Sequence, residues 1–152
     1  MGYRSKSLMA LPEKDVQLLE YIHRYIQTAK ACCAVLCAAS GHDITRTYNW
    51  RHQAVLPQKG EVKGITYAFH GRGCFFKTQG VTLDVDFDTV RGCNAFDEWR
   101  IRHFLEENYP KETYWLLFLS EGLTRLVQQR VLHQVPREHD EHFYYLGAAP
   151  ES

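Results

Sequence analysis

The sequence has no paired set of cysteines that would form a disulfide framework. Its five cysteines are Cys32, Cys33, Cys37, Cys74 and Cys93, an odd number without paired spacings. The first three fall within one expected helix and have no fourth zinc ligand nearby, so we interpret them as small buried residues. Reduced thiols are the simplest interpretation, and neither a metal nor another cofactor is expected.

The sequence also lacks an excess of charge of either sign. Lysine plus arginine and aspartate plus glutamate both number 18, so the formal net charge is zero. A protein that binds the phosphate backbone non-specifically normally carries a basic excess. The balance therefore argues against non-specific nucleic-acid binding.

No long hydrophobic run, internal repeat or low-complexity tract is present. The longest apolar stretch, Ala29 to Ala39, is interrupted by Lys30 and is too short to span a bilayer. The N-terminal segment has no apolar core or cleavage pattern of a signal peptide. These features predict a cytoplasmic protein without a membrane partner. With 152 residues, 45% of them hydrophobic, we expect a single domain over 1–152 whose flexible ends are about 1–11 and 147–152.

A long helix is expected over residues 12–39. Apolar residues recur at spacings of three and four from Val16 to Leu36, which places them on one stripe of a helix. Pro12 suits the first turn, and Gly41 is a typical stop signal.

The rest of the chain predicts three strands, two helices and a hairpin. Alternating segments indicate strands at 62–69, 74–77 and 81–87, separated by glycine-containing turns. Helices are expected at about 95–108, with Asn94 as N-cap, and at about 112–129, followed by a hairpin of 131–135 with 143–146. The predicted fold is therefore α+β: a long N-terminal helix, a three-stranded antiparallel meander, two further helices and a C-terminal β-hairpin. The helices are expected to cover one face of the sheet.

The most distinctive pattern is a row of acidic residues on the third strand. Thr82, Asp84, Asp86 and Asp88 alternate with apolar residues, so we expect them on the outer face of a half-buried strand. A solvated face is the plainest interpretation. The row also suits a basic protein partner, and two carboxylates about 6 to 7 Å apart can share a divalent cation.

A histidine and a cysteine flank a glycine-rich turn in His70-Gly71-Arg72-Gly73-Cys74. A Cys–His pair makes a nucleophile only if the two side chains meet and a third group orients the base. We favour a turn whose glycines take positive φ, with His70 bonded to the backbone or to a carboxylate.

Two aromatic and three charged side chains gather in Phe96-Asp97-Glu98-Trp99-Arg100. Asp97 and Arg100 are spaced three residues apart on the expected helix, where an ion pair can form. Phe96 is expected in the core, while Trp99 is either a core residue or an exposed anchor.

Three of these segments together resemble a small bacterial domain family. The pattern His70-Gly71-x-Gly73-Cys74, the strand end Asp84-Val85-Asp86-Phe87 and the pattern Phe96-Asp97-x-Trp99-Arg100 are similar to those of domains found among immunity proteins of polymorphic toxin systems, contact-dependent inhibition included. The resemblance covers roughly residues 65–105. It implies a cytosolic protein that binds and neutralises a cognate toxin domain, and it brings no catalytic residues. The eight motif residues are expected to determine the fold: His70, Gly71, Gly73, Cys74, Phe96, Asp97, Trp99 and Arg100.

The expected function is thus that of an immunity protein and not of an enzyme. Thr82, Asp84, Asp86 and Asp88 are the expected contact surface for a basic, nuclease-like toxin, because such a toxin must bind phosphate.

Two alternative functions stay open. A winged-helix nucleic-acid binder would use helices 95–108 and 112–129 and the hairpin, although their basic residues are few. A small hydrolase or nuclease would use His70 with Asp84 or Asp86, which requires these side chains to share a cleft.

Overall fold

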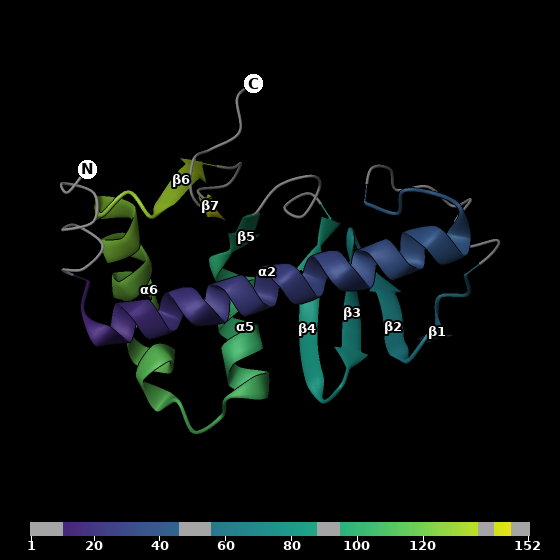
Figure 1. The fold of residues 1–152 in the computed structure, drawn as a ribbon, viewed down its shortest axis with the longest axis horizontal. Helices are drawn as coiled ribbons and strands as arrows, with labels where there is room; N and C mark the ends of the chain where they lie inside the picture. The colour runs from purple at the N-terminus through teal and green to yellow at the C-terminus, as the bar shows by residue number, and fades with distance from the viewer. Residues whose placement is uncertain (1–10, 46–55, 88–94, 137–141, 147–152) are drawn as a thin grey trace.

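The computed structural model describes residues 11–45, 56–87, 95–136 and 142–146 (Figure 1). Its elements are, in chain order, α2 (Glu13–Ser40), β1 (Lys59–Val62), β2 (Ile65–His70), β3 (Gly73–Thr78), β4 (Val81–Asp86), β5 (Ala95–Asp97), α5 (Glu98–Asn108), α6 (Thr113–Gln128), β6 (Leu132–Pro136) and β7 (His142–Leu146). β1 to β4 form an antiparallel sheet in chain order, and β5, β7 and β6 form a second sheet in that order. The α+β class, the long first helix and the terminal hairpin are confirmed.

The first sheet has one strand more than the sequence predicted. The strand expected over 62–69 begins instead at Ile65, because Lys63 (φ 50°) and Gly64 (φ 80°) form a turn. Val62 is the last residue of the additional strand β1, which begins at Lys59, before the predicted strand. Two successive residues with positive φ are typical of the tight turn of a β-hairpin. The prediction missed this turn because its first residue is lysine and not the usual asparagine, aspartate or glycine.

The second helix begins three residues later than predicted. Residues 95–97 are strand β5, which pairs with β7, and Asp97 is the N-cap of α5. The Asp97 side chain accepts a hydrogen bond of 2.8 Å from the backbone N–H of Arg100, which satisfies one of the free donors of the first turn. The predicted N-cap, Asn94, lies outside the described residues.

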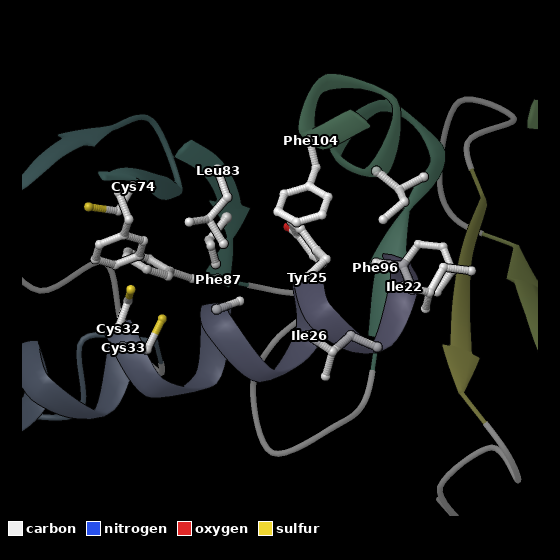
Figure 2. Close-up of a cluster of buried hydrophobic side chains, with 14 of the residues drawn as sticks. Ile22, Tyr25, Ile26, Cys32, Cys33, Cys74, Leu83, Phe87, Phe96 and Phe104 are labelled. Carbon is white, nitrogen blue, oxygen red and sulfur yellow. The ribbon is translucent and has the colours of Figure 1, made fainter. Parts of the chain in front are cut away.

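α2 covers one face of the first sheet and extends over α5 to α6. In Figure 1 it crosses in front of β4 to β1 and of α5, with α6 near its N-terminal end. Its buried side chains are spaced three or four residues apart, as predicted, and include Leu18, Ile22, Tyr25, Ala29, Cys32 and Leu36. Val16, where the predicted stripe began, is instead 40% exposed. Figure 2 shows Tyr25 of α2 beside Phe104 of α5, with the ring centroids 5.5 Å apart. Each such aliphatic or aromatic side chain contributes about 1.5–3 kcal/mol on burial.

α5 lies beside β4 and covers the edge of that strand. The Asn108 side chain replaces a neighbouring strand, because its Nδ2 donates to the Thr82 carbonyl at 2.6 Å and its Oδ1 accepts from the Thr82 N–H at 2.8 Å. Two residues further along β4, the Tyr25 hydroxyl of α2 donates a hydrogen bond of 2.7 Å to the Asp84 carbonyl. These bonds satisfy backbone groups that an open edge would offer to another chain.

An ion pair joins the N-terminal end of α2 to α6. Arg125 of α6 donates from Nε and Nη2 to the fully buried carboxylate of Asp15, at 2.7 and 2.9 Å. These bonds raise the pKa of the Arg125 guanidinium above its usual range. None of the described helices is long and apolar enough to cross a membrane.

Candidate functional site

The face of the first sheet that points away from α2 carries the side chains of His70, Thr82, Asp84 and Asp86. Side chains alternate between the two faces of a strand, so the residues between the buried ones belong to this outer face. The strand register arranges them in three cross-strand rows: His70, Gly73 and Asp86; then Lys59, Ala68, Phe75 and Asp84; then Glu61, Thr66, Lys77 and Thr82.

The carboxylates of β4 lie on the outer face, but the prediction that they are solvated is wrong for the two that are described. Asp84 is only 1% exposed and Asp86 only 6%. The alternation of side chains along β4 determines which face of the sheet the carboxylates lie on. The carboxylates are buried because α5 packs along β4 and covers this part of the face. Thr82 is half-buried and bonded through its backbone to Asn108. Asp88 lies outside the described residues.

Asp84 is instead the centre of a polar cluster with buried carboxylates, which we call the Asp84 cluster: His70, Asp84, Asp97 and Arg100. His70 Nε2 lies 2.5 Å from Asp84 Oδ1, and Arg100 Nε lies 3.4 Å from Asp84 Oδ2. The second contact is an ion pair and not a hydrogen bond, because Arg100 Nε has no hydrogen-bond partner among the described residues. Arg100 Nη1 is also 3.4 Å from Asp97 Oδ2, which confirms the predicted ion pair. A buried carboxylate needs such partners to offset its lost hydration.

The Asp84 cluster also touches the core through Tyr25. Burial, assisted by the charges of Asp97 and Asp84, raises the pKa of the Tyr25 hydroxyl well above its ordinary value. The hydroxyl therefore stays protonated and remains a hydrogen-bond donor to the Asp84 carbonyl. The cluster thus connects α2, β2, β4 and α5.

His70 and Cys74 do not meet, because they project from opposite faces of the sheet. Cys74 is fully buried beneath α2, near Cys32 and Cys33 (Figure 2). Burial raises the pKa of the Cys74 thiol to about 12 and that of Cys32 to about 11. These thiols are therefore poor nucleophiles at neutral pH, and the interpretation of His70 as bonded to a carboxylate is confirmed.

Raised thiol pKa values predict that the protein loses stability in alkaline solution. The native thiols keep their protons up to higher pH than those of the unfolded chain, whose pKa is near 9. The free energy of unfolding should therefore fall as the pH rises from about 9 toward 12. Cys74 alone should contribute a loss on the order of 2 kcal/mol by pH 10.5.

Urea unfolding at pH 8 and about pH 10.5 measures this loss. Cys74→Ala should be less stable at pH 8 but should lose less between the two pH values. Equal losses for Cys74→Ala and the wild type would contradict the assignment to this thiol.

The outer face is hollowed into a groove of about 660 Å³ between β1 and α5. Ala68 and Phe75 line its floor, Lys59 belongs to the β1 side, and His103 and Glu107 belong to α5. His103 and Glu107 are one helical turn apart and therefore lie on the same side of α5. The Nδ1 atom of His103 is buried and has no hydrogen-bond partner within the described part of the chain.

Next to the groove is an aromatic patch, which we define as Phe75, Trp99, Arg100 and His103. The Trp99 and His103 rings are stacked, with centroids 5.6 Å apart and an interplanar angle of 9°. Arg100 lies 4.9 Å from the Trp99 ring centroid, and Phe75 packs on the His70 ring at 4.2 Å. Trp99 is 56% exposed and Phe75 is 41% exposed, whereas Phe96 is fully buried.

Sequence reasoning therefore placed Phe96 correctly and left Trp99 undecided, while it missed Phe75 and His103 as surface residues. The spacing of Trp99, His103 and Glu107 by four residues was the signal that could have revealed a common helix face. No comparable signal was available for Phe75, since Cys74-Phe75-Phe76 is apolar on both faces.

The structure has only part of the geometry that the hydrolase alternative requires. His70 and Asp84 are in contact, as that alternative demands. Within the described residues, however, no hydroxyl or thiol is bonded to the His70 ring. Nor do the described ranges contain three or more His, Cys, Asp or Glu side chains grouped to hold a metal ion.

The fold and this face define a small α+β domain with a groove and an exposed aromatic patch on its antiparallel sheet. Residues 18–146 match the family described as "Domain of unknown function (DUF6896)", and because the match spans most of the chain, the protein belongs to this family. No curated protein and no solved structure gives a significant match.

Proposed function

We propose that the protein is a cytosolic immunity protein that binds and neutralises a cognate toxin domain, and that it does so through the aromatic patch. The observation that carries the proposal is the exposure of Trp99 and Phe75 beside Arg100. Tryptophan, other aromatic residues and arginine are enriched in protein interfaces and supply most binding hot spots. The motif resemblance over residues 65–105 provides the class of partner.

The geometry of the patch favours binding at low entropic cost. The Trp99 indole contacts two neighbouring side chains: it stacks on the His103 ring and lies close to the Arg100 guanidinium. A side chain that is already fixed loses less rotamer freedom when a partner covers it. The patch therefore presents an exposed aromatic surface beside Arg100, whose charge is already paired with Asp84 and Asp97.

The proposal does not include the acidic contact surface that was expected from the sequence. Asp84 and Asp86 are buried and cannot reach a partner without rearrangement of the sheet. The winged-helix alternative is also weakened, because Arg125, one of the few basic residues near the expected recognition helix, is bonded to Asp15.

Trp99→Ala should abolish much of the toxin binding and leave the fold intact. Truncation of a hot-spot tryptophan weakens binding by about 2 kcal/mol or more, or roughly 30-fold in Kd. Because Trp99 is mostly exposed, the melting temperature should change by only about 2 °C or less. Calorimetric titration with the cognate toxin domain measures the first effect, and thermal unfolding measures the second.

The matched control is Leu117→Ala, which truncates an apolar side chain that is 73% exposed on α6. It should bind the toxin as the wild type does. The same pair of variants can be compared for protection of a bacterial host that expresses the toxin domain. Failure of the wild type to protect, or full affinity in Trp99→Ala, would contradict the proposal.

A further inference from the structure

A closed series of side-chain contacts connects the Asp84 cluster to the aromatic patch. Each member contacts the next, and the last contacts the first: Asp84, His70, Phe75, His103, Trp99 and Arg100. The series begins at a carboxylate that is 1% exposed and reaches the surface at Phe75 and Trp99, which are 41% and 56% exposed. Both exposed aromatic side chains are therefore connected to the same buried carboxylate.

The first connection runs from Asp84 through His70 to Phe75. β3 lies between β2 and β4, so His70 on β2 reaches across β3 to Asp84 on β4. On the way its ring lies against the Phe75 ring of β3, with the centroids 4.2 Å apart. The bond to Asp84 fixes the orientation of the imidazole, and the imidazole then limits the positions that the Phe75 ring can take.

The second connection runs from Asp84 through Arg100 to Trp99. Arg100 Nε is 3.4 Å from Asp84 Oδ2, and the guanidinium carbon is 4.9 Å from the centroid of the Trp99 ring. Asp97, the N-cap of α5, pairs with the same guanidinium through Nη1. An arginine that two carboxylates hold is a fixed neighbour for the indole beside it.

His103 joins the two exposed rings and closes the series. Its ring stacks on that of Trp99 and lies 6.3 Å from that of Phe75, centroid to centroid. A displacement of either exposed ring therefore changes the surroundings of the other.

We infer that, given the proposed immunity function, Asp84 is a positioning residue of the binding surface. By holding His70 and Arg100 at once, its carboxylate fixes Phe75 and Trp99 in the arrangement that the toxin domain contacts. Asp84 itself is too deeply buried to contact a partner. A surface whose side chains are held by buried neighbours loses less freedom when a partner covers it.

Asp84→Asn tests this positioning without any partner. The amide keeps the size of the side chain but no longer supplies a charged acceptor to both His70 and Arg100. In NMR spectra of the wild type, nuclear Overhauser cross-peaks should connect the Trp99 ring with the His103 ring and the Phe75 ring with the His70 ring. We expect both sets of cross-peaks to be lost in Asp84→Asn.

Asp15→Asn is the matched control, since it also removes the charge of a buried carboxylate that is bonded to an arginine. Asp15 and Arg125 lie outside the closed contact series, so this variant should lose stability but keep the cross-peaks between the rings. The Kd for the cognate toxin domain should rise about tenfold in Asp84→Asn and stay within about twofold of the wild type in Asp15→Asn.

The outcomes separate this inference from the proposed function. Unchanged cross-peaks in a folded Asp84→Asn, an equal loss of cross-peaks in Asp15→Asn, or lost cross-peaks with an unchanged Kd would each overturn the positioning role, while binding by the wild type would leave the immunity function in place. If the wild type does not bind the toxin domain, the proposed function fails, and the cross-peaks alone decide whether Asp84 positions the rings.

A second variant covers the case in which Asp84→Asn does not fold. His70→Ala truncates a side chain that is 31% exposed, so its cost in stability should be smaller. It removes the connection between Asp84 and Phe75, and the cross-peaks between the Phe75 and His103 rings should weaken. Cross-peaks of unchanged intensity would overturn the positioning role.

Discussion

Gly73→Ala is expected to destabilise the fold strongly, although it adds a single methyl group. A Cβ atom at this position would lie 2.0 Å from the carbonyl oxygen of Val85 and 3.1 Å from its carbonyl carbon. Both atoms belong to the backbone of β4, which is paired with β3 and therefore cannot move aside as a flexible side chain can. We expect a loss of about 3 kcal/mol or more, which is the scale of severe overpacking.

Gly71→Ala is the matched control for this effect, because it adds the same methyl group two residues away. Gly71 has φ of +44° and open space around its Cβ direction, so only the strain of the left-handed conformation is added, about 1–2 kcal/mol. Urea unfolding followed by circular dichroism measures both variants. Similar stability of the two variants would show that β4 yields at Val85 and that the close approach is not essential.

The two glycines illustrate what the sequence could predict here and what it could not. Positive φ was expected for both, and this is confirmed for Gly71 only. Gly73 is required by the close approach of a strand whose position depends on the register of β3 and β4. The sequence shows only that a glycine stands in a turn pattern. It does not show whether glycine is required there by the backbone conformation or by a steric contact with another strand.

The predicted elements were largely correct because their causes are local. The periodicity of α2, the alternation of β4 and the polar loop of the terminal hairpin each depend on neighbouring residues. The covering of Asp84 is not local, since His70 is 14 residues away and the Asn108 that fastens α5 to β4 is 26 residues from Thr82. The acidic row was therefore assigned to the correct face but to the wrong environment.

Asp84→Ala is expected to produce the second large loss of stability, about 3 kcal/mol. The substitution removes the carboxylate that His70 and Arg100 share, and an ion pair broken on one side leaves the other charge without compensation. His70 and Arg100 are 31% and 24% exposed, so water can partly replace the lost carboxylate. We therefore expect a loss of stability at the lower end of the usual range. Asp84→Asn should lose less, because its amide oxygen can still accept a hydrogen bond.

Glu98→Ala is the matched control for Asp84→Ala, since it also removes a carboxylate from an arginine ion pair. Glu98 and Arg102 are each about one-third exposed and lie 3.0 Å apart; such a surface pair contributes about 0–1 kcal/mol. Urea unfolding of both variants at neutral pH measures the difference between a buried and a surface carboxylate. If Asp84→Ala were as stable as Glu98→Ala, the His70–Asp84 contact would have no structural purpose.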